Sequence, residues 1–191
     1  MSRYLACLLF VSLGCGLAPR SALALPPVSL IGSSALGPAR GGAGVHGDLS
    51  ARWQLSPYWS LVTTGRAGGV VGHSAQPELL LGLLIGPGFG LPVGRSLMRM
   101  SLQVAHIHHT GADAWRARPT ANLAGDSSGS VLHRSGLEAS VGWTWPSLHE
   151  FSAWSLVLET DVAGGVLPAS EALAWSAGLR LGLGLVPRSG R

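Results

Sequence analysis

Three histidines stand within four positions of the stretch V-A-H-I-H-H-T-G-A-D at residues 104–113. An imidazole can serve as a general base beside a hydroxyl nucleophile, and it is also a common zinc ligand. Thr110 follows His108 by two residues, and Ser135 follows His133 at the same spacing. Because residues two apart on a strand share a face, each pair predicts a base beside a hydroxyl group.

The same histidines also fit a metal site. His106 and His108 are two residues apart, with His133 and Asp113 further along the chain. Imidazole nitrogens and a carboxylate oxygen are usual ligands of zinc. A zinc site therefore stands beside the catalytic interpretation.

The N-terminus has the features of a secretory leader. Arg3 precedes an apolar run at residues 5–17, and the small residues of S-A-L-A at 21–24 suit a signal peptidase. The apolar run is shorter than the roughly 20 residues of a membrane helix. We expect a signal peptide over residues 1–24 and one domain over 25–191. Both cysteines, Cys7 and Cys15, lie in the leader, and the alternative for Cys15 is a lipid-modified N-terminus.

Composition narrows the class of the remaining chain. The formal net charge of +4 includes Arg3 and Arg20 of the leader, and the small scattered excess argues against a nucleic-acid surface. Hydrophobic residues make up 47% of the chain and charged residues 12%, yet no later run is long enough for a membrane helix. A membrane protein without spanning helices must be a closed β-barrel.

Strict alternation indicates such a barrel. Residues 44–55 place apolar side chains at odd positions and polar ones at even positions, and residues 172–185 set leucines against glycine, serine and arginine. A transmembrane barrel turns its large apolar residues to lipid and fills its interior with small and polar ones. The alternative, a glycine-rich soluble sheet, would turn the leucines inward.

Eight strands follow from this period, so the predicted fold is an all-β, eight-stranded antiparallel transmembrane β-barrel. The expected strands are 28–35, 44–55, 59–70, 78–86, 95–106, 135–145, 152–160 and 172–185. Short periplasmic turns are expected at 56–57, 87–94 and 146–148, and outside loops at 37–42, 72–77, 107–129 and 164–170. Trp53, Trp59, Trp143 and Trp145 would form an aromatic belt near the periplasmic ends.

The polar phase of these strands predicts the content of the lumen. It collects Asp48, Arg52, Arg66, Arg99, Gln103, Glu138, Glu159 and Arg180. Opposite charges in a narrow, buried lumen must pair, because an unpaired buried ion is costly. We therefore expect a plug of ion pairs rather than a transport pore.

The lipid-facing phase is where the histidines fall. If strand 95–106 continues without a bulge, His106, His108 and Thr110 face lipid near the outer leaflet, whereas His109 points the other way. On the next strand, His133 and Ser135 share the lipid-facing phase. Ionisable residues that face lipid are costly and usually functional. The pattern predicts a site that meets lipid from the side of the barrel.

Residues 106–145, with H-H-T-G and the later H-R-S-G-L-E, resemble the outer-membrane phospholipase A and lipid A 3-O-deacylase group. Those barrels carry an H-x-S site on the lipid-facing wall and a third acidic or amide residue that orients the histidine. The sequence departs from the motif, because position 108 is histidine where an H-x-S from His106 would have serine.

The resemblance implies an acyl-ester hydrolase. In it His108 would be the base, Thr110 the nucleophile and the Gly111 amide an oxyanion donor. His133 and Ser135 are the alternative pair. The third member would be Asp113 or Glu138, although Glu138 is expected to face the lumen.

The sequence thus predicts a small barrel of the Gram-negative outer membrane whose outer-leaflet site hydrolyses acyl esters of lipid A or phospholipid. The alternative is a non-catalytic structural or adhesion barrel that contacts lipopolysaccharide, with loop arginines on phosphates. Those arginines are Arg116, Arg118 and Arg134. Expected partners are outer-membrane lipid, lipopolysaccharide and, in transit, the barrel-assembly machinery, with no nucleic acid and no cofactor.

Overall fold

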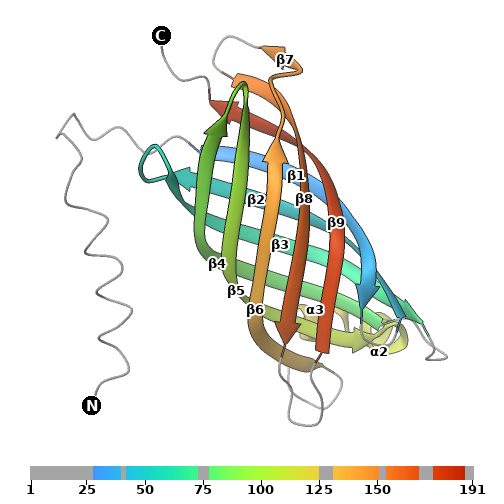
Figure 1. The fold of residues 1–191 in the computed structure, drawn as a ribbon. Helices are drawn as coiled ribbons and strands as arrows, with labels where there is room; N and C mark the ends of the chain where they lie inside the picture. Colours follow the sequence, from blue (N-terminus) through green and yellow to red (C-terminus); the bar gives the residue numbers. More distant parts are fainter. Residues whose placement is uncertain are drawn as a thin grey trace, which may run out of the picture.

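The computed structural model describes residues 28–39, 42–72, 78–124, 131–150, 154–167 and 174–187 of the 191-residue chain. Eight long antiparallel strands in these ranges close into a barrel (Figure 1). They are β1 (Val28–Ala39), β2 (Gly42–Gln54), β3 (Trp59–Gly72), β4 (Glu78–Val93), β5 (Ser96–Gly111), β6 (Leu132–Thr144), β8 (Trp154–Leu167) and β9 (Ala174–Pro187).

Consecutive long strands pair with one another, and the pairing of β1 with β9 closes the ring. The first strand meets the last, with Leu30 opposite Leu185. Strand β6 meets β8, with Leu137 opposite Val166. The two-residue β7 (His149–Glu150) adds to the edge of β8. The predicted eight-stranded antiparallel barrel is therefore confirmed.

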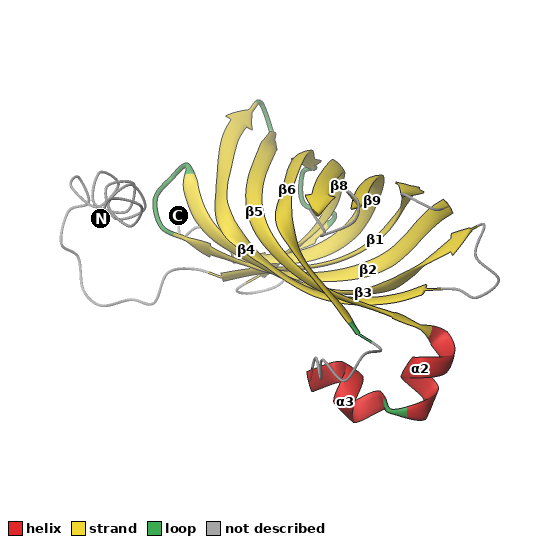
Figure 2. Cartoon of the chain, turned by 90° about the horizontal axis from the view of Figure 1, so that it is seen from below, coloured by secondary structure: helices red, strands yellow, loops and turns green. Residues whose placement is uncertain are grey.

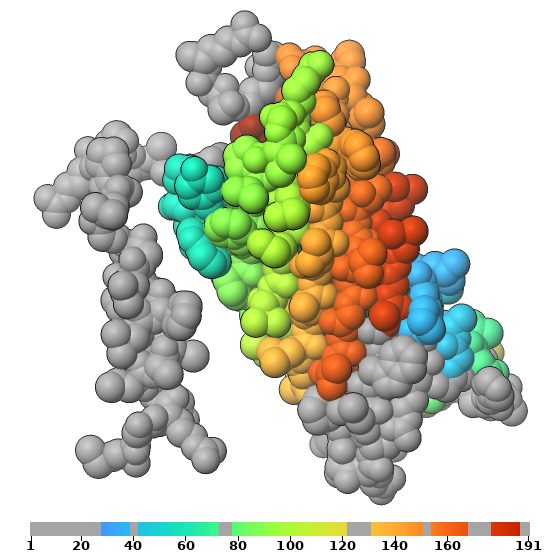
Figure 3. Space-filling model, viewed as in Figure 1, coloured from blue at the N-terminus to red at the C-terminus, as the bar shows by residue number. Residues whose placement is uncertain are grey.

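The alternation sets the two faces of the wall as the sequence predicts. Leu49 is 65% exposed, whereas Asp48 beside it is 5% exposed. Leucines at 179, 181, 183 and 185 of β9 are exposed in the same way, and Arg180 between them is buried. Figure 3 shows one side of this outer wall. An apolar outer face of this kind is the surface that lipid covers in a transmembrane barrel.

Several predicted loop boundaries are wrong because strands run further than the sequence pattern suggests. Strand β4 continues through Pro87 and Pro92 to a tight turn at Gly94, so 87–94 is not a loop. Strand β8 reaches Leu167, into the predicted loop 164–170. A proline cannot donate a backbone hydrogen bond. The residues around Pro87 and Pro92 nevertheless stay paired with β3 and β5, so the strand continues.

The predicted outside loop 107–129 is also corrected. Strand β5 continues through His109 to Gly111, and two short helices follow, α2 (Ala112–Ala117) and α3 (Pro119–Ala124). Figure 2 places both helices at the end of the barrel where β5 stops. In the described part of the chain, no helix is long and apolar enough to cross a membrane. The expected signal peptide at 1–24 lies outside the described residues.

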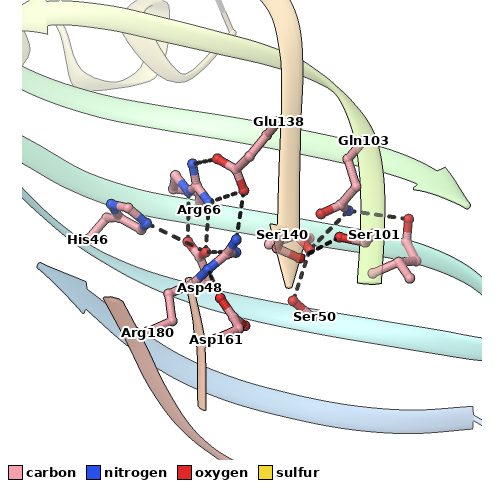
Figure 4. Close-up of polar contacts among 12 residues, drawn as sticks. His46, Asp48, Ser50, Arg66, Ser101, Gln103, Glu138, Ser140, Asp161 and Arg180 are labelled. Carbon is pink, nitrogen blue, oxygen red and sulfur yellow. Dashed lines mark hydrogen bonds and ion pairs between the residues drawn. The ribbon is translucent and has the colours of Figure 1, made fainter. Parts of the chain in front are cut away.

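Ion pairs fill the lumen (Figure 4). The Arg66 guanidinium donates from Nε to Asp48 Oδ1 at 2.8 Å and from Nη1 to Glu138 Oε2 at 2.6 Å. Arg180 donates to the same two carboxylates, at 3.0 Å each, and from Nε to Asp161 Oδ1 at 2.7 Å. We call these five residues the plug. Four of them were predicted for the lumen, while Asp161 falls after the predicted end of its strand at 160.

A second group of lumen residues lies toward the end of the barrel where β2 turns into β3. Arg52 binds Glu159 through two guanidinium nitrogens, and Arg99 donates to Thr144 Oγ1 at 2.7 Å. The cavity beside Arg52 and Arg99 has a volume of about 10 Å³, room for roughly one water. The lumen is thus packed with side chains, as expected for eight strands.

Candidate functional site

The candidate site is formed by β5 and β6 on the outer face of the barrel wall. In their register His106 lies opposite Ser135, and His108 lies opposite His133. His106 and His133 are exposed on the outer wall, and His108 is half-buried. Four of the residues predicted to face lipid, His106, His108, His133 and Ser135, thus come together from two strands, and we call them the outer-wall cluster.

Short polar contacts join the cluster. His106 Nδ1 is 3.0 Å from Ser135 Oγ, and His106 Nε2 is 3.1 Å from His108 Nε2. His133 Nδ1 approaches the same His106 Nε2 at 3.4 Å. One ring nitrogen of His106 therefore faces a hydroxyl, and the other faces two imidazoles.

The structure adds a contact across strands to the pairs predicted along them. The spacing within each strand predicts that His108 serves Thr110 and that His133 serves Ser135. In the structure the hydroxyl of Ser135 meets His106 of the neighbouring strand. Thr110 is buried at 7% exposure, so its hydroxyl is less accessible to a lipid substrate than that of the exposed Ser135. A sequence read strand by strand does not contain the register that makes this cross-strand pair.

The two proposed orienting carboxylates lie elsewhere. Glu138 faces the lumen and binds Arg66 and Arg180 there, so it is on the opposite side of the wall from Ser135. Asp113 lies in α2, where its Oδ1 accepts from Arg116 Nη1 at 3.3 Å. The assignment of Glu138 to a catalytic role on the outer face is therefore incompatible with its position.

Two further predicted residues also face inward. His109 Nδ1 is 3.3 Å from Glu78 Oε2, which agrees with its predicted opposite phase. Arg134 lies between the outward-facing His133 and Ser135 of β6, and its Nε atom is buried. Arg134 therefore does not belong with Arg116 and Arg118, the exposed arginines expected to contact phosphates outside the barrel.

The cluster follows the apolar outward-facing residues of β5, at a level of the barrel where lipid is expected. From Met98 to Val104 the outward residues are apolar, and this span rises by roughly 15 Å at the usual strand tilt. The apolar band of outer-membrane barrels is about 25 Å tall. Imidazole groups thus begin within the band, where polar side chains are costly.

A broad depression of about 1110 Å³ adjoins the cluster, and His106 and His108 form part of its lining. Its sides carry exposed leucines such as Leu83 and Leu183. Its floor is made of small outward residues on three adjacent strands. These are Gly32, Ser34, Gly47, Gly65 and Ala67.

The floor glycines are not required by the packing of the wall. A Cβ atom added at Gly65 would come no closer than 4.0 Å to another atom, and one at Gly32 would meet nothing within 4 Å. By contrast, a Cβ at the inward-facing Gly86 would lie 2.0 Å from the carbonyl oxygen of Leu102. The missing side chains on the floor therefore hollow the outer wall without serving the fold.

Three known structures are similar to this chain. Neisserial surface protein A matches with a TM-score of 0.62 and 9% identity, over 83% of this chain and 96% of that chain. Ail, the attachment invasion locus protein of Yersinia pestis, gives 0.49 and 10%, covering 84% and 99%. The N-terminal barrel domain of Pseudomonas aeruginosa OprF gives 0.48 and 13%, covering 84% and 99%. No family model and no curated protein sequence matches the chain.

At this low identity, the first of these likenesses shows the fold alone, that of a small outer-membrane β-barrel. Together with the exposed apolar wall, this fold supports a location in the bacterial outer membrane. The resemblance to the phospholipase and lipid A deacylase group has no counterpart among the matched structures described above.

Proposed function

We propose that this chain is a non-transporting barrel of the outer membrane that binds an outer-leaflet lipid on its outer wall. An acyl chain occupies the depression, and the lipid's polar head meets the outer-wall cluster. The observation that carries the proposal is the cluster itself, three imidazoles and a hydroxyl gathered on a lipid-facing surface.

The lumen supports a role outside the barrel. The plug holds Asp48 and Glu138 between Arg66 and Arg180, and breaking such buried pairs costs several kcal/mol. A solute passing through the lumen would have to separate these charges. The plug therefore argues against transport and leaves the outer wall as the surface for function.

The outer wall supports lipid as the ligand. The depression is bordered by exposed leucines, and acyl chains are the molecules that surround this face in a membrane. Imidazole and hydroxyl groups at its edge can hydrogen-bond the ester, phosphate or sugar oxygens of a lipid head. Polar groups beside an apolar depression match the two parts of a lipid molecule.

Mass spectrometry of lipids that remain bound to the purified, folded barrel tests this proposal. The wild-type barrel should retain one lipid A or phospholipid molecule after detergent exchange, and the mass identifies which. Gly65→Leu, which fills the floor, should reduce retention several-fold. Val162→Leu, an exposed position on β8 away from the depression, is the matched control. Equal lipid retention in both variants would contradict the proposal.

Acyl-ester hydrolysis is the second candidate, favoured by one contact. Ser135 Oγ lies 3.0 Å from His106 Nδ1, a distance at which the imidazole can accept the hydroxyl proton as the oxygen attacks an acyl carbonyl. The other nitrogen of His106 faces imidazoles rather than a carboxylate. Because a carboxylate would orient and stabilise the protonated base, hydrolysis ranks second.

Lipid A and phospholipid profiles of cells that express the chain separate the two candidates. Hydrolysis predicts loss of one acyl chain's mass, abolished by Ser135→Ala and retained by Thr110→Ser. Binding alone predicts unchanged profiles in cells where the barrel is folded in the outer membrane. Loss of activity in a Thr110→Ala variant with full activity in Ser135→Ala would instead restore the pair expected from the sequence.

A further inference from the structure

Three imidazoles of the outer-wall cluster point their nitrogens at one region of space. Ligand atoms of His106, His108 and His133 all lie within 4.8 Å of one another. The rings come from two strands, and the cross-strand rings of His108 and His133 have centroids only 4.5 Å apart. This convergence is a property of the register, because His108 and His133 are directly opposite.

The nitrogen spacing fits a tetrahedral metal. Two imidazole nitrogens bound to zinc at 2.0–2.1 Å are separated by about 3.3 Å when the angle at the metal is tetrahedral. His106 Nε2 is 3.1 Å from His108 Nε2 and 3.4 Å from His133 Nδ1. Two of the three nitrogen pairs therefore have the spacing of a tetrahedral zinc site, and the third pair lies within 4.8 Å.

The contact with Ser135 supports the same assignment. A histidine that ligates a metal through one nitrogen usually donates its other N–H to an oxygen, which fixes the ring's tautomer and orientation. His106 Nδ1 is 3.0 Å from Ser135 Oγ on the side of the ring away from the other imidazoles. Ser135 therefore has the position of an outer-shell oxygen.

The donor atoms argue in the same direction. A neutral imidazole offers one nitrogen lone pair to a cation, so the three rings together offer three. Nitrogen ligands without thiolate suit zinc, copper and nickel. Zinc accepts three histidines with a fourth position left for an oxygen ligand.

We propose that His106, His108 and His133 bind one Zn²⁺ ion on the outer wall, with Ser135 orienting His106 and the fourth position open to an oxygen ligand. The site goes beyond lipid binding and does not depend on it. When zinc is bound, His106 and Ser135 cannot act as base and nucleophile, because a metal on His106 Nε2 leaves Nδ1 carrying a hydrogen. That nitrogen then donates to Ser135 and cannot take the serine proton.

Zinc titration of the full-length mature barrel tests the site. The protein is purified without a polyhistidine tag, stripped with a chelator and titrated in lipid-free detergent micelles against a chromophoric zinc chelator. One zinc per barrel is expected. His106→Ala and His133→Ala should each weaken binding at least 100-fold, and Ser135→Ala about 10-fold. His149→Ala, a histidine of the exposed turn strand β7, should leave affinity unchanged.

Cobalt gives an independent readout. Co²⁺ in the wild-type site should show the intense visible bands of a tetrahedral complex, and His108→Ala should lose them while the heat-sensitive migration of a folded barrel remains. Wild-type zinc affinity no tighter than that of His106→Ala would overturn the proposal, as would binding that His149→Ala abolishes. Because lipid is absent from these titrations, either outcome leaves the lipid-retention test independent.

Discussion

The plug in the lumen and the outer-wall cluster are built on opposite faces of the same barrel wall, and they satisfy their polar groups differently. In the plug, arginines and carboxylates alternate so that Arg66 and Arg180 share Asp48 and Glu138. In the cluster, the groups are three imidazoles and a hydroxyl. The plug sets cations against anions, whereas the cluster is rich in ligand atoms of one kind.

The two groups of side chains predict different roles for the two faces of the wall. A closed set of opposite charges leaves little capacity for a ligand, and removing one member is costly because a buried charge is left without its partner. A set of like ligand atoms on an exposed surface gains most from an external partner, such as a lipid oxygen or a cation. Stability should therefore depend on the plug and binding on the cluster.

Breaking the plug should have the largest effect on stability. Arg66→Met leaves Asp48 and Glu138 each with one guanidinium fewer, so the free energy of unfolding should fall by about 3–5 kcal/mol. Urea unfolding of the barrel in lipid vesicles, followed by tryptophan fluorescence, measures the change. A loss below about 1 kcal/mol would mean that the plug is not a main stabilising element.

Glycines on the two faces should differ by a smaller amount. Gly86→Ala places a Cβ atom 2.0 Å from the Leu102 carbonyl oxygen, and such overpacking costs roughly 1–3 kcal/mol. Gly65→Ala on the outer floor has space and should be neutral or stabilising by up to about 1 kcal/mol. The same unfolding assay compares the pair, and equal losses would contradict the distinction between required and hollowing glycines.

Removing an imidazole from the outer wall should stabilise the metal-free barrel slightly. His106→Leu replaces a polar group that faces lipid, so the unfolding free energy should rise by about 1 kcal/mol or less, even with the contact to Ser135 lost. Val104→Leu, the preceding outward position, is the control. A loss above about 2 kcal/mol in chelator-treated protein would show that the cluster supports the fold as the plug does.

The ion pair of helix α2 should matter least. Asp113 and Arg116 are both highly exposed, with side-chain exposures of 62% and 80%, and solvent screens such pairs. Arg116→Ala should therefore change stability by no more than roughly 0.5 kcal/mol. A thermal shift as large as that of the Arg66 variant would mean that exposure is a poor guide to the value of ion pairs in this barrel.

Much of the fold could be predicted from the sequence because a strand's side chains alternate with a fixed period. The phase of β5 places Gln103 inside and His106 outside from residue order alone. Strand ends were harder, because Pro87 and the glycines around it are typical of turns but here continue β4. Local composition cannot show that neighbouring strands supply enough pairing to extend a strand.

An eight-stranded barrel, its apolar outer wall and the lumen positions of Asp48, Arg66, Glu138 and Arg180 follow from the sequence alone, since these depend on alternation and composition. Which polar groups meet depends on the tertiary structure. The pairing of His106 with Ser135, and of His108 with His133, depends on the register of β5 against β6. Register is fixed by the closure of the whole barrel and the packing of both faces, so no single strand contains it.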